Sequence, residues 1–220
     1  MLMKVISLNV GQPQEIFHEG KIIRTGIFKR PVEGRVRVRA LNVEGDEQAD
    51  LTVHGGPSKA VYVYPAEHYE FWRRELPGVS FSWGMFGENL TTEGLLEKEI
   101  NVGDRFCIGS VELRVTEPRL PCYKLNLKFS RDDMVKRFLK SRRTGFYCAV
   151  AREGDIGVGD EIECLGRNEG KMTVADITRV YAFDKADAHT LRRAVALEAL
   201  PENWRDYFRD QLAKATGTTL

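Results

Sequence analysis

Cys122 is the side chain in this sequence whose neighbours best suit chemistry. It lies in residues 118–124 (PRLPCYK), with Arg119 and Lys124 close by. Proline lacks a backbone donor and restricts the residue before it, so we expect a regular strand or helix to stop here and leave a stiff loop. Nearby cations favour the thiolate, which attacks electrophiles and binds soft metals. The alternative is a small buried hydrophobe, the usual fate of a free cysteine.

Cations occur at two other turns. In residues 54–59 (HGGPSK), His54 and Lys59 flank a glycine pair that lets the backbone approach a ligand closely. The competing interpretation is a plain turn with a hydrogen-bonded histidine. Lys29 and Arg30 precede a proline at a turn, where cations can reach a ligand.

A glycine-rich stretch at residues 83–94 carries short polar side chains that would fix a polar ligand. Its glycines surround Glu88, Asn89 and Thr91. The alternative is that Asn and Thr satisfy the bonds of their own turn, with Glu88 as a structural acceptor in the loop.

Composition bounds the class of protein. The chain has 220 residues, enough for one sizeable domain or a domain with an appendage, and a formal net charge of +1. A net charge this close to zero gives the protein no overall electrostatic field that would attract nucleic acid or a membrane surface. The four cysteines form no C-x-x-C pair, so neither a disulfide framework nor a zinc site is indicated. The first ten residues do not resemble a signal peptide and no long apolar run follows, so we expect a reduced, cytoplasmic protein.

The elements that must position these residues are mostly short strands. Alternating patterns at residues 4–10, 35–41 and 111–116, and apolar runs at 60–64 and 145–151, predict a mainly β body. Helical spacing appears at residues 65–76, with aromatic residues expected in the core, and again at 130–140. Three further cysteines, Cys107, Cys148 and Cys164, lie in apolar strand-like runs and are expected to be buried.

From residue 171 onward the pattern changes to three short helices. Thr173 with Asp176 resembles a capping box, Asp187 is a second cap, and Pro201 opens the third helix. We therefore expect a β domain at residues 1–166 and a three-helix extension at 171–217. Three short helices bury little alone, so they would pack on the body or on a partner chain, which leaves a homodimer open. A DNA-reading helix-turn-helix is disfavoured because basic residues are few and mixed with acids.

Several motifs together resemble the MOSC family, which is named after the C-terminal domain of molybdenum-cofactor sulfurases. The resemblance rests on segments across nearly the whole chain: HGG at 54–56, KAVY at 59–62, GENLT at 87–91, GDRF at 103–106, PRLPCYK at 118–124 and ALPENWR at 199–205. The last segment is similar to the helical extension of bacterial single-domain members. The resemblance implies a MOSC-type β-barrel with a few short helices and a small C-terminal three-helix appendage.

The resemblance also implies a cofactor and a reaction. Molybdopterin-bound molybdenum would be held by the thiolate of Cys122, and N-hydroxylated compounds such as N-hydroxylated purines would be reduced to amines, without pyridoxal phosphate. No flavin or iron–sulfur motif is visible, so electrons would come from a separate reductase. The remaining expectations concern the cofactor phosphate, the pterin and the proton. Arg119, Lys59, Lys29 and Arg30 would hold the phosphate, Asn89 and Thr91 the pterin or phosphate, and His54 would supply a proton or orient a ligand.

Two rival functions share these residues. In the first, the protein is a cofactor carrier or sulfur-delivery module, with the metal on Cys122 but no substrate turnover. In the second there is no metal, and the basic loops bind an anionic metabolite or a nucleic-acid phosphate.

Overall fold

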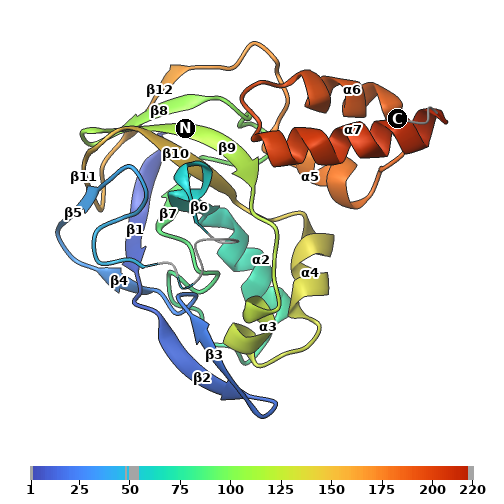
Figure 1. The fold of residues 1–220 in the computed structure, drawn as a ribbon. Helices are drawn as coiled ribbons and strands as arrows, with labels where there is room; N and C mark the ends of the chain where they lie inside the picture. The colour runs from blue at the N-terminus through green and yellow to red at the C-terminus, as the bar shows by residue number, and fades with distance from the viewer. Residues whose placement is uncertain (1, 48, 50–54, 218–220) are drawn as a thin grey trace.

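The computed structural model describes residues 2–47, 49 and 55–217. Its largest element is an eight-stranded sheet (Figure 1). The strands follow the order β12 (Ile162–Gly166), β8 (Arg105–Ile108), β9 (Val111–Pro118), β10 (Phe146–Arg152), β6 (Val61–Pro65), β7 (Leu90–Glu93), β1 (Lys4–Val10) and β4 (Arg30–Val32). All neighbours are antiparallel except β6 and β7, which are parallel. The predicted mainly β body is confirmed.

The sheet is not closed into a barrel, so that part of the predicted fold is wrong. Its two edges are β12 and β4. The start of β1 contacts the start of β12 through an isolated bridge between Lys4 and Glu161 and a hydrogen bond from the Ile162 amide to the Met3 carbonyl. Closure needs a continuous ladder, but the outer edge of β1 is used by the short β4 from Leu8 onward.

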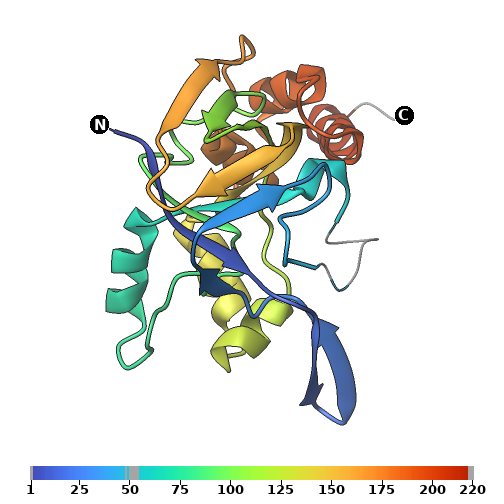
Figure 2. The same ribbon diagram turned by 90° about the vertical axis from the view of Figure 1, so that its left-hand side faces the viewer.

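Four strands pair outside the large sheet. β5 (Arg35–Val38) pairs with β11 (Gly154–Gly157). β2 (Gln14–His18) and β3 (Lys21–Thr25) form a hairpin that projects away from the body in both views (Figures 1 and 2). The hairpin returns the chain to Thr25, so the turn that follows it lies against the end of the sheet.

A cluster of aromatic side chains fills the space between β6 and three helices: α2 (Glu67–Glu75), α3 (Lys124–Phe129) and α4 (Met134–Ser141). Tyr69 and Trp72 of α2 are buried, as expected from the helical spacing. The rings of Trp72 and Phe138 stack with centroids 5.9 Å apart. Burying one such side chain contributes about 1.5–3 kcal/mol, and the cluster holds α3 against the sheet. The sequence pattern did not predict α3.

The C-terminal extension consists of α5 (Val174–Ala182), α6 (Ala188–Ala196) and α7 (Glu202–Thr216) at one end of the sheet (Figure 2). Thr173 and Asp176 form the predicted capping box, and Asp187 caps α6 through the Thr190 amide. The helices share one apolar core with the sheet, in which Ile177, Leu191 and Phe208 are fully buried. No helix among the described residues is long and apolar enough to cross a membrane.

The three cysteines expected in the core behave differently from one another. Cys148 on β10 is buried, and burial raises the pKa of its thiol. Cys107 and Cys164 are only half-buried, so the prediction was wrong for them. Cys107 alternates with the buried Phe106 and Ile108 and therefore points to the other face, while Cys164 lies on the edge strand β12.

A short 3-10 helix, η1 (Pro57–Lys59), comes immediately before β6 and contacts β9 and β10. It begins after Gly56, whose φ of 94° favours glycine. This turn places Lys59 next to the segment that carries Cys122.

Candidate functional site

Cys122 lies where β9 gives way to α3. The strand ends at Pro118, as expected, and the helix begins at Lys124 after a loop of five residues. The backbone carbonyl of Cys122 accepts a hydrogen bond of 2.9 Å from the Leu125 amide, which ties the loop to the first turn of the helix. Cys122 is half-buried. Its thiol is therefore held in place and still reachable, which the buried alternative for this cysteine would not allow.

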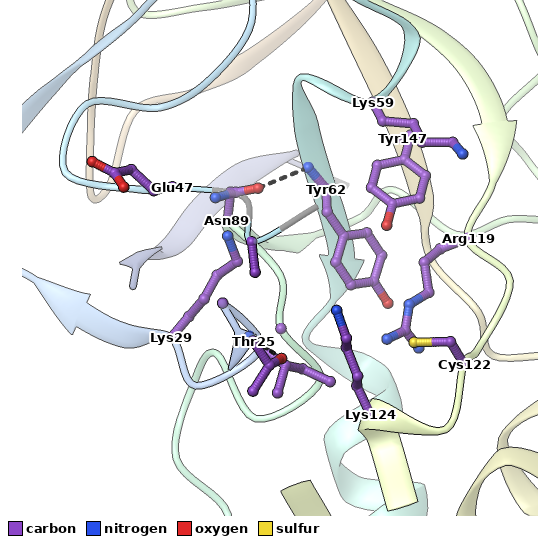
Figure 3. A pocket seen from close by; sticks show the side chains of 14 residues that line it. Thr25, Lys29, Glu47, Lys59, Tyr62, Asn89, Arg119, Cys122, Lys124 and Tyr147 are labelled. Atoms are coloured by element: carbon purple, nitrogen blue, oxygen red, sulfur yellow. Dashed lines mark hydrogen bonds between the residues drawn. The ribbon is translucent and has the colours of Figure 1, made fainter. Parts of the chain in front are cut away.

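Cys122 opens onto a hollow of about 610 Å³. Four cations, Lys29, Lys59, Arg119 and Lys124, face it with one carboxylate, Glu47. Such a set favours an anionic ligand. The described residues that line it come from all over the body (Figure 3): Thr25, Gly26, Ile27, Lys29, Glu47, Ala49, Lys59, Tyr62, Gly87, Asn89, Arg119, Cys122, Lys124 and Tyr147.

Arg119 is the most unusual of these cations because it is buried, with 5% of its surface exposed. Its guanidinium carbon lies 5.3 Å from the ring centre of Tyr62 and 5.0 Å from that of Phe138, a cation–π arrangement. Burial disfavours its charge, yet interactions with Tyr62, Tyr147 and Cys122 hold its pKa above the ordinary value.

One nitrogen of Arg119, Nη1, has no hydrogen-bond partner among the described residues. A buried donor left without an acceptor costs about 1–3 kcal/mol. The guanidinium lies beside the Cys122 sulfur (Figure 3). The arrangement thus leaves a cationic donor ready for an acceptor that the described part of the chain does not supply.

Two tyrosines form the wall of the hollow behind Arg119. The rings of Tyr62 and Tyr147 lie 5.2 Å apart, and the Tyr62 hydroxyl donates to the Thr144 carbonyl at 2.8 Å. Burial raises the pKa of both hydroxyls, so both keep their protons near neutral pH. Neither tyrosine was expected at the site, because tyrosines within apolar strands look like ordinary core residues.

Lys29 and Asn89 reach the hollow but are also tied into the protein. Lys29 forms an ion pair with Asp46, and burial lowers its pKa although Asp46 opposes this. Asn89 donates to Asp46 at 2.9 Å and accepts from the Tyr62 amide at 3.0 Å. These contacts fix the floor of the site. No sequence signal pointed to Asp46, which is brought there only by folding.

The other predicted residues are placed less directly. Thr91 is fully buried, accepts from Asn9 at 3.1 Å and donates to Glu88 at 2.9 Å. Arg30 is exposed on β4. Neither belongs to the described lining of the hollow, whereas Lys59 does. His54 lies outside the described residues.

Glu88 is the structural acceptor of its loop, which was one of the alternatives drawn from the sequence. Its carboxylate accepts from the amides of Gly84 at 2.9 Å and Phe86 at 3.1 Å, and from the hydroxyls of Thr91 and Tyr69. Burial raises the pKa of Glu88, while these donors lower it.

Among the described residues there is no group of three His, Cys, Asp or Glu side chains that would hold a metal ion. A metal bound at Cys122 would therefore have fewer than three such ligands from the described residues and must bring most of its other ligands with it. A soft sulfur donor beside cations suits a soft or high-valent metal on an anionic carrier.

Two protein-family models match the chain. A model described as MOSC domain matches residues 50–163, and one described as YiiM-like, 3-alpha helix domain matches residues 172–215. The chain belongs to the MOSC domain family. The resemblance drawn from the sequence motifs is confirmed, including the helical extension.

Two bacterial relatives of this MOSC protein match almost end to end. YflK of Bacillus subtilis (strain 168) is 43% identical over 204 residues, which cover 93% of this chain and 92% of YflK. YiiM of Escherichia coli (strain K12) is 34% identical over 192 residues, with coverages of 86% and 84%. A protein of Gibberella moniliformis named Reductase is 33% identical over 202 residues, covering 90% of this chain but 36% of the fungal protein.

The fold matches that of solved relatives. The crystal structure of YiiM from Geobacillus stearothermophilus superposes with a TM-score of 0.81 at 32% identity, covering 96% of this chain and all of that one. The crystal structure of YiiM from Escherichia coli gives 0.74 at 26% identity, with coverages of 97% and 94%. The arrangement of sheet and helical extension is thus a YiiM-like fold.

Proposed function

We propose that this MOSC protein is a molybdenum-cofactor-dependent reductase that converts N-hydroxylated compounds, such as N-hydroxylated purines, to amines. The observation that carries the proposal is the unpartnered, buried Nη1 of Arg119 beside the half-buried thiol of Cys122. The relative named Reductase supports the choice of an oxidoreductase.

The residues present fit the cofactor. Its anionic portion would satisfy Arg119 Nη1 and face Lys59 and Lys124, whose charges line the same hollow. Charge-assisted hydrogen bonds of this kind are about twice as strong as neutral ones. Lys29 and Asn89 would contribute from the floor, where Asp46 fixes them. Cys122 would be the protein ligand to the metal.

When bound, the cofactor would supply the two-electron exchange: R–NH–OH, two electrons and two protons give R–NH₂ and water. Around it, the rings of Tyr62 and Tyr147 would exclude water from one side. The Tyr147 hydroxyl interacts with Arg119 and keeps its proton because burial raises its pKa. His54 stays a proposed proton donor. Because no flavin or iron–sulfur motif is visible in the sequence, a separate reductase would deliver the electrons.

Molybdenum analysis of purified protein tests the metal assignment. We expect close to one molybdenum per chain from a molybdate-replete host, and at least a tenfold loss in Cys122→Ser with unchanged thermal unfolding. Cys107→Ser is the matched control, since that thiol is also half-buried but does not line the hollow. A Cys122→Ser protein that keeps its metal would disprove the assignment.

Turnover is tested separately with the metal-loaded protein, an artificial electron donor and 6-hydroxylaminopurine. Formation of adenine supports the reductase. Protein that retains molybdenum on Cys122 but forms no amine would instead be a cofactor carrier or sulfur-delivery module.

A further inference from the structure

A second hollow, of about 980 Å³, also has Cys122 in its lining. It is bounded by the loop after β9 and by residues of α5 and α7, so it follows the seam between the sheet and the helical extension. Three residues line both hollows: Lys59, Cys122 and Tyr147. Cys122 thus lines both hollows.

The two spaces differ in chemistry. Among the described lining residues, the first has four cations and one carboxylate, whereas the second has one cation, Lys59, one carboxylate, and aromatic side chains from the helical extension. Tyr181 packs against Trp204 at 5.1 Å and against Tyr207 at 5.0 Å between ring centres. Pro118 and Pro121 form part of the opposite side. Aromatic and apolar walls of this kind suit a neutral planar ring, not a phosphate.

The carboxylate in the seam is that of Glu117, which is 2% exposed. It accepts a hydrogen bond of 3.0 Å from the Ser58 hydroxyl and another from Trp204 Nε1. A carboxylate has about four acceptor positions, so these two donors from the described residues leave capacity for N–H groups of a ligand. The bond to Trp204 also fixes the indole as part of the wall.

We propose that this seam binds the planar heteroaromatic ring of the substrate, with Glu117 accepting from its N–H groups and its N–OH group directed toward Cys122. This assignment rests on the proposed reductase function for the direction of the N–OH group, but the ring site itself can be tested without the cofactor. The C-terminal helices would then determine specificity.

Calorimetric titration of adenine into protein without cofactor tests the ring site. We expect saturable binding by the wild type and about tenfold weaker binding by Tyr207→Ala, since stacking on one aromatic side chain accounts for a change of that order. Phe183→Ala is the matched control, because Phe183 is an exposed aromatic of the extension that does not line the seam. Asn203→Trp, at an exposed position on the rim, fills the hollow without removing core and should abolish binding.

The outcomes distinguish the ring site from the proposed function. Absence of adenine binding by the wild type, or equal binding by all variants, would overturn the assignment. With loaded enzyme, Tyr207→Ala should raise the KM for 6-hydroxylaminopurine about tenfold and leave molybdenum content unchanged. Loss of molybdenum in this variant would show that the seam belongs to the cofactor site and would also overturn it. If Cys122→Ser keeps its metal while adenine still binds, the proposed function fails and the ring site stands.

Discussion

Replacing Trp204 by phenylalanine should destabilise the protein in a pH-dependent way. The change removes the hydrogen bond from the indole to Glu117 and leaves that buried carboxylate with Ser58 as its donor. A hydrogen bond to a charged group contributes about 1.5–3 kcal/mol, and shrinking a side chain that is 5% exposed costs about 1 kcal/mol more. We expect a loss of about 3 kcal/mol at pH 8, or about 6–12 °C in Tm for a chain of this size.

The pH dependence follows from Glu117. Burial raises its pKa above 4.5, and the bond from Trp204 lowers it. In Trp204→Phe the folded-state pKa rises further, so the folded protein binds more protons than the unfolded chain just above pH 4.5. Relative to the wild type, the stability deficit should therefore be small below the wild-type folded pKa, which itself lies above 4.5, grow between that pKa and the higher folded pKa of the variant, and then level off.

Thermal unfolding followed by circular dichroism at pH 5 and pH 8 measures the stability deficit of Trp204→Phe relative to the wild type. Tyr207→Phe is the control on the same helix and should change stability by less than about 0.5 kcal/mol, as for a substitution that makes no cavity. In a Glu117→Gln background, Trp204→Phe should cost about 1–2 kcal/mol at both pH values, because no buried charge remains. Equal deficits at pH 5 and pH 8 in the wild-type background would refute the reasoning.

Two further predictions concern buried ionisable groups. Glu88→Gln should lower the free energy of unfolding in urea by about 2–3 kcal/mol, since an amide nitrogen would face donors such as the amides of Gly84 and Phe86; an unchanged urea midpoint would contradict this. Burial lowers the pKa of Lys128 to about 8, so the folded state opposes its charge below that pH. Lys128→Met should therefore stabilise the protein by about 1 kcal/mol at pH 7, and the gain should disappear as pH rises from about 8 to 10.5; a gain independent of pH would count against this explanation.

Local chemistry was predictable from the sequence because it depends on residues close together in the chain. The caps at Thr173 and Asp187 follow from side chains that bond amides three residues onward. The alternation in residues 111–116 and the proline after it located β9 and its end. The irregular loop that carries Cys122 follows from the same local rules.

The partners of each charged side chain were decided only by the tertiary structure. Lys29 looked like a free cation at a turn, but the fold gives it Asp46, which is buried with it. Arg119 looked like a loop cation, yet it is stacked on Tyr62 with one nitrogen left open. The sheet stays open because β4 occupies part of the edge that closure would need.

The second space beside Cys122 was likewise invisible in the sequence, since Glu117 and Trp204 are 87 residues apart and meet only when α7 packs on the sheet. Sequence periodicity reports which face of an element is apolar. It does not report which distant element covers that face, and the two hollows at Cys122 are formed by such long-range packing.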